Sequence, residues 1–317
     1  KKKISSDIGS HSVTFSSDYA YYIDNWSDAN TAPKYTIRDA KGKQQLVLED
    51  NADLNAKMKE YGFAKEEFFT FKTSENVELN GWMIKPANME KGKKYPVFMY
   101  MYGGPGVNTV ENGFGYFDFA WFQMLAQKGY IVVSVDNRGT GGRGEEFKKC
   151  TYMQLGKYEV ADQIEAAKYL GALDYVDKSR IGVFGWSFGG YLSTLCMTKG
   201  NEYFKAGIAV APVTNWRYYD NIYTERFMRT PQENADGYDS NSPINFVKKL
   251  KGKYLLVHGT TDDNVHVQNS MDLVSALVNA NREFDMFFYP NKNHSIYGGF
   301  TRYHLYNKMT NFILENL

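Results

Sequence analysis

A serine framed by glycines lies between a predicted strand and a predicted helix. A short apolar run leads into Gly185-x-Ser187-x-Gly189, and a helix-compatible run follows at 191–198. A strand-to-helix turn this tight lifts the serine hydroxyl clear of the sheet, and a side chain at either glycine would collide with neighbouring backbone. The N–H of Phe188 would then face any anion formed beside the serine. The pattern predicts a nucleophile, and the alternative is a solvated serine in a tight turn.

A base and an acid for this serine follow two later strands. Asp262 comes after a predicted strand at 254–257, and His294 comes after a predicted strand at 284–289. A serine nucleophile needs a base that takes its proton and an acid that holds the base in one tautomer. In α/β-hydrolases the chain order is Ser, then Asp or Glu, then His, each at the carboxyl end of a strand. Asp262 and His294 fit this order; the alternatives are a turn-capping aspartate and a loop histidine.

Two other histidines compete with His294 for the role of base. His258 stands at the end of a strand before the acid, where we expect a packed or hydrogen-bonded histidine. His266 follows in the same loop. A zinc site made of His258, Asp262 and His266 is a further alternative, although this spacing matches no helical pair of ligands.

Two glycine-rich runs are further candidates for binding loops. The run Tyr102-Gly103-Gly104-Pro105 ends a predicted strand, where α/β-hydrolases place the second donor to an oxyanion. Tyr102 could donate its hydroxyl hydrogen to the oxyanion. The alternative is that its ring only forms an aromatic wall of the site. The run 139–144 fits G-x-G-x-x-G, but a dinucleotide site needs a helix that opens at the third glycine. Acidic residues stand where pyrophosphate would bind, so we expect no nucleotide.

The first 50 residues are predicted to form short strands separated by turn-forming residues. These strands are rich in β-branched and aromatic residues and occupy 12–15, 19–24, 34–38 and 45–48. Four short strands match one β-propeller blade in size. Because a lone blade cannot bury both faces, we expect missing propeller blades upstream of this one. We place a partial propeller domain at 1–53 and a catalytic domain at 54–317, with a helix predicted at 54–61.

From residue 96 apolar strands alternate with amphipathic helices, which is typical of a mostly parallel sheet. An antiparallel pair at 67–71 and 79–84 precedes them. The predicted strands are 97–102, 131–135, 181–184, 206–210, 254–257 and 284–289, and the predicted helices are 119–128, 160–170, 191–198, 271–279 and 300–314. We therefore predict an α/β-hydrolase fold, preceded by a short all-β segment that resembles the last blade of a β-propeller.

The composition argues against several other functions. The net charge is +1, from 37 basic and 36 acidic residues, so no field of one sign is available to attract nucleic acid. No apolar run approaches the ~20 residues that span a membrane. The two cysteines, Cys150 and Cys196, form neither a disulfide framework nor a metal-ligand spacing.

Three stretches together resemble the dipeptidyl peptidase IV branch of the prolyl oligopeptidase family. They are the elbow at 185–191, the loop at 258–266 and the aromatic stretch at 209–226. The resemblance covers about residues 60–317. It implies a serine peptidase that cleaves peptides after proline, or less readily after alanine, without a metal or cofactor.

The resemblance assigns roles to individual residues. Ser187, Asp262 and His294 would form the catalytic triad, and Tyr102 with the Phe188 N–H would form the oxyanion hole. Asn264 would bind the carbonyl of the penultimate substrate residue. The pocket for the proline ring would be lined by Val213, Trp216, Tyr219, Tyr223 and Val265. A rigid proline ring suits an apolar slot with aromatic walls, and the alternative for these aromatics is core packing.

The family's exopeptidases hold the substrate's free amino group with a glutamate pair in the propeller, and no such segment occurs in this chain. Release of dipeptides is therefore not encoded in these residues. Enzymes with the same triad that remain as alternatives are an acyl-peptide hydrolase, a tripeptidyl peptidase and an esterase. An alternative of another class is a catalytically silent interaction scaffold. The resemblance also implies a homodimer and a periplasmic, cell-surface or secreted location.

Overall fold

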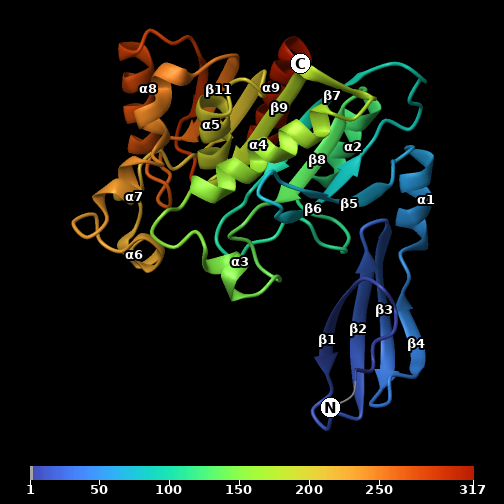
Figure 1. Ribbon diagram of the computed structural model, residues 1–317. Helices are drawn as coiled ribbons and strands as arrows, with labels where there is room; N and C mark the ends of the chain where they lie inside the picture. Colours follow the sequence, from blue (N-terminus) through green and yellow to red (C-terminus); the bar gives the residue numbers. More distant parts are fainter. Residues whose placement is uncertain (1–2) are drawn as a thin grey trace. The chain divides into compact units, whose positions relative to one another are not determined.

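The computed structural model describes residues 3–317, and Figure 1 labels many of its helices and strands. The chain divides into two compact units. One comprises Lys1–Glu67, Ile84–Asn88 and Glu111–Lys128, and the other comprises Phe68–Met83, Met89–Val110 and Gly129–Leu317. The domain boundary expected between residues 53 and 54 stays a prediction.

The amino-terminal part of the first unit is a four-stranded antiparallel sheet in the order β1-β2-β3-β4. Its strands are β1 (Ser10–Phe15), β2 (Tyr21–Asp28), β3 (Thr31–Asp39) and β4 (Gln44–Glu49). The prediction of a separate all-β segment is confirmed. Asp24 is buried in this sheet, where it accepts a hydrogen bond from His11 and pairs with Arg38 at 3.0 Å. Several apolar side chains of the sheet are exposed, namely Val13, Phe15, Tyr21, Ile23, Leu46 and Leu48.

The first unit also holds two helices, α1 (Ala52–Glu60) and α2 (Phe119–Gln127). The side-chain amide of Gln123 on α2 bonds both the N–H and the carbonyl of Ala64, at 2.8 and 2.9 Å. This pair of bonds fastens the chain between α1 and the next strand to a helix that follows almost 60 residues later.

Most of an eight-stranded sheet lies in the second unit, in the order β12-β11-β10-β9-β7-β8-β6-β5. The six strands from β7 to β12 pair in parallel, so the prediction of a mostly parallel sheet is confirmed. The strands are β5 (Glu66–Lys72), β6 (Glu78–Ile84), β7 (Tyr95–Met101), β8 (Ile131–Asp136), β9 (Val176–Trp186), β10 (Ala206–Val210), β11 (Lys253–Gly259) and β12 (Asp285–Tyr289).

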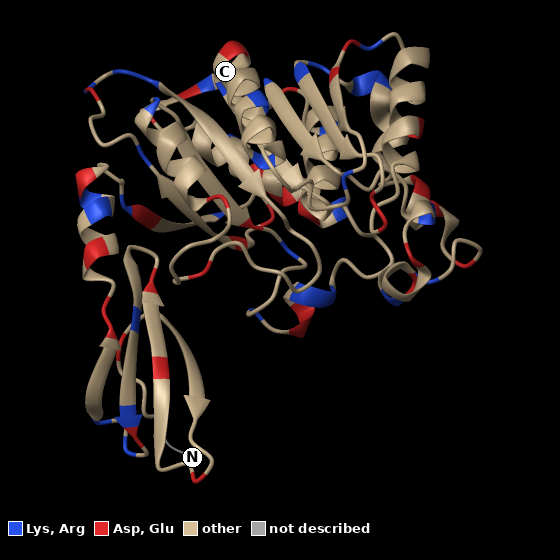
Figure 2. Ribbon diagram, turned by 180° about the vertical axis from the view of Figure 1, so that it is seen from behind, with Lys and Arg blue, Asp and Glu red and all other residues tan. Residues whose placement is uncertain are grey.

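The central strands carry few charges because helices and loops cover both faces of a parallel sheet. Strands β7 and β10 contain no Lys, Arg, Asp or Glu, and every residue of β10 is buried. Figure 2 shows these strands in tan, with both signs of charge on the surrounding helices and loops. Parallel strands also bring their carboxyl ends to one edge of the sheet, where ligand sites of such folds usually form.

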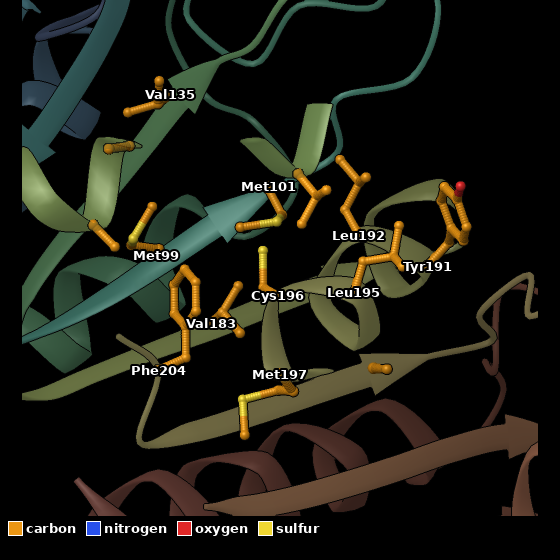
Figure 3. Packing of buried hydrophobic residues seen from close by; sticks show 14 of the residues in the cluster. Met99, Met101, Val135, Val183, Tyr191, Leu192, Leu195, Cys196, Met197 and Phe204 are labelled. Carbon is orange, nitrogen blue, oxygen red and sulfur yellow. The ribbon is translucent and has the colours of Figure 1, made fainter. Parts of the chain in front are cut away.

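Helix α5 (Phe188–Lys199) packs against β9, β10 and the helix α4 (Lys157–Gly171). Its first eleven residues are all buried, which is the pattern of a helix enclosed on every side. Figure 3 shows Cys196 of this helix next to Met101 and Val183 of the sheet. The helix that follows the serine is therefore a fixed part of the core.

The remaining helices are α3 (Glu145–Lys149), α6 (Asn221–Met228), α7 (Ala235–Asp239), α8 (Gln268–Asn279) and α9 (Thr301–Asn316), with short 3₁₀ turns η1 (Trp216–Tyr218) and η2 (Pro243–Lys249). None of the helices in residues 3–317 combines the length and the apolar character that crossing a lipid bilayer requires.

The glycine-rich run at 139–144 differs from the expectation in one respect. A helix, α3, does begin after its third glycine, but it has only five residues and its first turn holds Glu145 and Glu146. The run supports another loop: Gly106 donates to the carbonyl of Gly139, and Gly141 donates to the side chain of Asn108. This loop therefore braces the segment that follows Tyr102.

Candidate active site

Ser187 occupies the strained turn that the glycine pattern predicts. It follows the last residue of β9, and its φ of 60° and ψ of −118° lie where non-glycine residues rarely occur. A Cβ at Gly185 would collide with the backbone of Gly189, and one at Gly189 would collide with the carbonyl of Met101. The N–H of Ser187 donates to the carbonyl of Val210 at 2.8 Å, which anchors the turn to β10.

Phe188 begins α5, so its N–H is one of the helix donors that have no partner within the helix. Partial positive charge at a helix start favours an anion beside it. The turn thus places a hydroxyl and a backbone donor on neighbouring residues.

Asp262 follows β11 and is held by four hydrogen bonds. The N–H groups of Asn264 and Val265 both donate to Oδ1 at 2.9 Å. The ring nitrogens of His294 and His258 lie 2.7 and 3.1 Å from Oδ2. Burial opposes ionisation of this carboxyl, yet the hydrogen bonds from the two histidines outweigh it and hold the pKa of Asp262 well below its usual range. The carboxyl is therefore charged at neutral pH.

His294 lies in the loop after β12, and the structure brings it together with Asp262. Its Nδ1 lies 2.7 Å from Oδ2 of the carboxylate, an ion-pair distance if the ring is protonated. The indole N–H of Trp186 donates to the backbone carbonyl of His294 at 3.0 Å. Since Trp186 precedes Ser187, this bond ties the histidine loop to the serine turn. Within residues 3–317 no hydrogen bond is described between the Ser187 hydroxyl and His294.

Tyr102 directly follows β7, and its ring centroid lies 6.1 Å from that of Phe188. Burial raises the pKa of the Tyr102 hydroxyl, so the group stays neutral and able to donate a hydrogen bond. Two buried side chains, Asn137 and Gln163, hold the turn that follows Tyr102. Asn137 donates to the carbonyl of Gly103 at 3.1 Å, and Gln163 donates to Asn137 at 3.0 Å.

The aromatic residues assigned to the pocket form one cluster. Trp216 of η1 contacts Tyr219 and Tyr223 with ring centroids 5.9 and 6.0 Å apart, and the two tyrosines lie 5.3 Å from each other. Burial raises the pKa of both tyrosines, and the nearby Tyr102 adds to it. Val213 and Val265 are buried beside this cluster in the same core.

Asn264 lies in the Asp262 loop and is exposed. The hydroxyl of Tyr219 donates to its Oδ1 at 2.6 Å. The amide oxygen of Asn264 is therefore engaged as an acceptor within the protein. One hydrogen bond therefore links the aromatic cluster to the residue expected to bind substrate.

Sequence reasoning named His258 but missed its contact with the acid, and it missed Trp186 and Asn137 entirely. His258 stands at a strand end four residues before Asp262, so strand geometry and loop length could have suggested the contact. Trp186 and Asn137 act through the carbonyls of distant loops, at His294 and Gly103. No local pattern signals such contacts.

The chain was compared with known proteins. Residues 116–317, more than half of the chain, match the model of the prolyl oligopeptidase family. A prolyl endopeptidase FAP of Bos taurus is 40% identical over 304 residues, which is 94% of this chain and 39% of the relative. A probable dipeptidyl-aminopeptidase B of Paracoccidioides brasiliensis is 43% identical over 260 residues, which is 79% of this chain and 28% of the relative.

Two solved structures are similar along almost the whole chain. The crystal structure of Porphyromonas gingivalis dipeptidyl peptidase 4 is 49% identical with a TM-score of 0.96, and the match covers 100% of this chain and 45% of that one. A putative dipeptidyl aminopeptidase IV of Bacteroides ovatus is 36% identical with a TM-score of 0.92, over 98% of this chain and 44% of that one.

The fold and the matches place the chain in a family of peptidases with an α/β-hydrolase fold. The chain belongs to the prolyl oligopeptidase family and is similar to dipeptidyl peptidase IV enzymes, which confirms the resemblance noted in the sequence. It spans less than half the length of the relatives and structures that it matches.

Proposed function

We propose that the chain is the catalytic part of a serine exopeptidase that releases amino-terminal dipeptides after proline, or less readily after alanine. Ser187 is the nucleophile, His294 the base and Asp262 the acid that orients the base. The observation that carries the proposal is the 2.7 Å hydrogen bond between His294 Nδ1 and the buried Asp262 carboxylate, in a loop tied to the serine turn. That bond leaves Nε2 of His294 as the nitrogen free to accept a proton.

The reaction would proceed through an acyl-enzyme. Oγ of Ser187 attacks the scissile carbonyl while its proton passes to Nε2 of His294. The tetrahedral oxyanion accepts hydrogen bonds from the Phe188 N–H and the Tyr102 hydroxyl. His294 then gives the proton to the leaving amine as the C–N bond breaks. Water hydrolyses the resulting ester by the same route, which restores Ser187 and releases the carboxylate product.

The proline ring of the substrate would lie against Trp216, Tyr219 and Tyr223, with Val213 and Val265 completing an apolar pocket. Tyrosine and tryptophan rings give a rigid pocket a large contact area, which suits a ring with few conformations. The carbonyl before the proline would accept a hydrogen bond from Asn264, whose amide is oriented by Tyr219.

The preference for a free amino terminus would come from outside these residues. We propose that residues 1–53 form the last blade of a propeller, that residues 54–317 form the catalytic domain, and that further blades complete the enzyme. The exposed apolar side chains of the four-stranded sheet support this, as does the fraction of each relative that the chain covers. A substrate ammonium group needs a carboxylate partner once it is desolvated, and the missing blades would supply it.

The full-length enzyme would be a homodimer through the face formed by β12 and α9. Met286, Phe300, Tyr303 and Leu314 are exposed large apolar residues there, and the first three line a groove of about 740 Å³. Exposed apolar side chains gathered on one face are typical of interaction sites. Full-length protein that carries both Phe300→Glu and Tyr303→Glu should sediment as a monomer. If it still sediments as a dimer, the interface lies elsewhere.

One assay tests the proposed activity. Full-length protein should cleave a chromogenic Gly-Pro substrate with a free amino group far faster than its N-acylated form. Faster turnover of N-acylated alanine, of a tripeptide substrate or of a simple ester would indicate the acyl-peptide hydrolase, tripeptidyl peptidase or esterase alternatives. No turnover of any of these substrates by folded protein would indicate a scaffold.

A further inference from the structure

The buried histidine His258 contacts Asp262, the proposed acid of the site. It lies near the end of β11 and is fully buried. Its Nε2 lies 3.1 Å from Oδ2 of Asp262 and 2.8 Å from the carbonyl oxygen of Val265. Its Nδ1 lies 2.7 Å from the hydroxyl of Ser270 on α8. Both ring nitrogens are therefore engaged within the protein.

The partners of the ring assign its tautomer. A carbonyl oxygen and an ionised carboxylate can only accept, so Nε2 must carry hydrogen and donate to both. In the neutral ring, Nδ1 then accepts the hydrogen of the Ser270 hydroxyl. Ser270 thus holds His258 in the tautomer that donates toward Asp262.

We propose that His258 is a positioning residue of the active site, which fixes the Asp262 carboxylate toward His294 and ties it to the wall of the proline pocket. The inference rests on the proposed function. Oδ2 of Asp262 accepts from two histidine rings, while Oδ1 accepts from two backbone N–H groups. Rotation of the carboxylate would weaken these four hydrogen bonds together.

The Nε2–H group of His258, which donates to two acceptors, also links the proposed triad to the proposed proline pocket. The carbonyl that accepts from His258 belongs to Val265, a residue of the proposed pocket, and the carboxylate that accepts from it belongs to the triad. The groups with charge that face His258 are Asp262 and, across the same oxygen, His294. One buried ring therefore sets the distance between the acid and the pocket wall.

The electrostatic effect of His258 has a definite sign. Its N–H presents positive charge to Oδ2 and helps to keep the Asp262 carboxyl ionised, since its hydrogen bond is the largest of the contributions that lower the pKa there. It also takes up part of the charge that would otherwise stabilise protonated His294. Removing it should therefore strengthen the hold of His294 on a proton.

The test uses full-length protein and the variants His258→Leu and His258→Gln. The Leu variant should lower kcat on Gly-Pro substrate about 10- to 100-fold, and the midpoint of the acidic limb of kcat/KM should rise by about half a pH unit or more. The downfield proton resonance of His294 Nδ1–H should shift as well. The Gln variant retains an N–H donor and should recover most of the activity, the midpoint and the resonance.

Two further variants sharpen this test. Ser270→Ala removes the hydroxyl that holds His258 in one tautomer. It should lower kcat less than His258→Leu does. His266→Gln is the matched control, because His266 is an exposed histidine of the same loop, and it should behave as the parent. Circular dichroism checks that each variant folds.

The outcomes separate the two proposals. A parent that turns over none of the substrates would overturn the proposed function, while the resonance of His294 in the folded protein would still report on His258. Parental midpoint and resonance in His258→Leu would overturn the positioning role. Equal losses in the Leu and Gln variants with an unmoved resonance would also overturn it, because they would show a role in folding alone.

Discussion

Two buried carboxyl groups of the second unit have opposite preferences for charge. Asp262, after β11, accepts four hydrogen bonds and has a pKa held well below its usual range. Glu159, in the first turn of α4, accepts one from Gly156 at 2.9 Å on Oε2. Its Oε1 has no hydrogen-bond partner among the described residues. Burial raises the pKa of Glu159 to about 8.

Burial opposes the charge of both groups, so the number and kind of donors decide the outcome. At Asp262 two rings and two backbone N–H groups offset desolvation, and the carboxylate stays charged beside the proposed base. At Glu159 the helix amides lower the pKa only in part, and the group stays mostly protonated near neutral pH. The fold thus keeps a buried charge at the site where the proposed chemistry uses it.

Removing the charge at Asp262 should have the largest effect. Asp262→Asn preserves the shape but places an amide against Nδ1 of His294, which favours the wrong tautomer of the base. Turnover should fall by about 10⁴-fold, as expected for loss of the orienting carboxylate. Asp263→Asn, at the exposed neighbour, is the control and should keep parental kcat. A comparable kcat in the two variants would show that Asp262 takes no part in the reaction.

The second-largest effect is expected at Tyr102, a partly buried residue whose hydroxyl stays neutral because burial raises its pKa. Tyr102→Phe should lower kcat by roughly 10²–10³-fold with little change in KM, because the hydroxyl would act chiefly on the developing oxyanion. Tyr61→Phe, at an exposed tyrosine, should change neither constant. A raised KM with intact kcat would make Tyr102 a wall residue.

The third prediction concerns stability and Glu159. A folded pKa of about 8 lies above the ordinary glutamate value, so the folded state binds a proton that the unfolded state releases. The stabilising contribution is complete below pH ~4 and is lost as pH rises through ~8. Between pH 6 and pH 8 the free energy of unfolding should fall by about 2 kcal/mol more in the parent than in Glu159→Gln.

Denaturant unfolding at a series of pH values measures this difference. Glu202→Gln, at an exposed glutamate, serves as the control and should follow the parental pH dependence. If Glu159→Gln also follows the parent, Glu159 is ionised in the folded protein and the contrast with Asp262 fails.

The smallest effect is expected at the link between the aromatic cluster and Asn264. Tyr219→Phe removes the 2.6 Å hydrogen bond to Oδ1 and frees the amide to rotate. A hydrogen bond of this kind contributes about 1 kcal/mol, so KM for Gly-Pro substrates should rise about fivefold with kcat nearly kept. The hydroxyl of Tyr218 interacts with Asp272 instead, and Tyr218→Phe should leave KM unchanged. Equal KM values in both variants would show that Asn264 does not depend on Tyr219.

The sequence predicted the features that are local. Glycines beside Ser187 indicated the turn, and alternating apolar strands and helices indicated the parallel sheet, because both depend on neighbours in the chain. The order of Ser187, Asp262 and His294 then followed from strands that end at one edge. The Asp262–His294 hydrogen bond was in reach of this reasoning.

Other features depend on tertiary neighbours and had no local signal. Glu159 has the sequence pattern of an ordinary first-turn glutamate. Only its burial in the fold leaves Oε1 without a hydrogen-bond partner among residues 3–317. The contacts of His258 require α8 to bring Ser270 beneath β11. Strand boundaries were also partly set by pairing: β9 begins at Val176, five residues before the apolar run, because it pairs there with β7.

Covalent labelling of Ser187 tests the central claim most directly. Full-length protein treated with a fluorophosphonate should carry one adduct, and peptide mapping by mass spectrometry should place it on Ser187. Folded Ser187→Ala protein should take up no label, and Asp262→Asn protein should be labelled far more slowly than the parent. An adduct on another serine, or undiminished labelling of Ser187→Ala, would contradict the account.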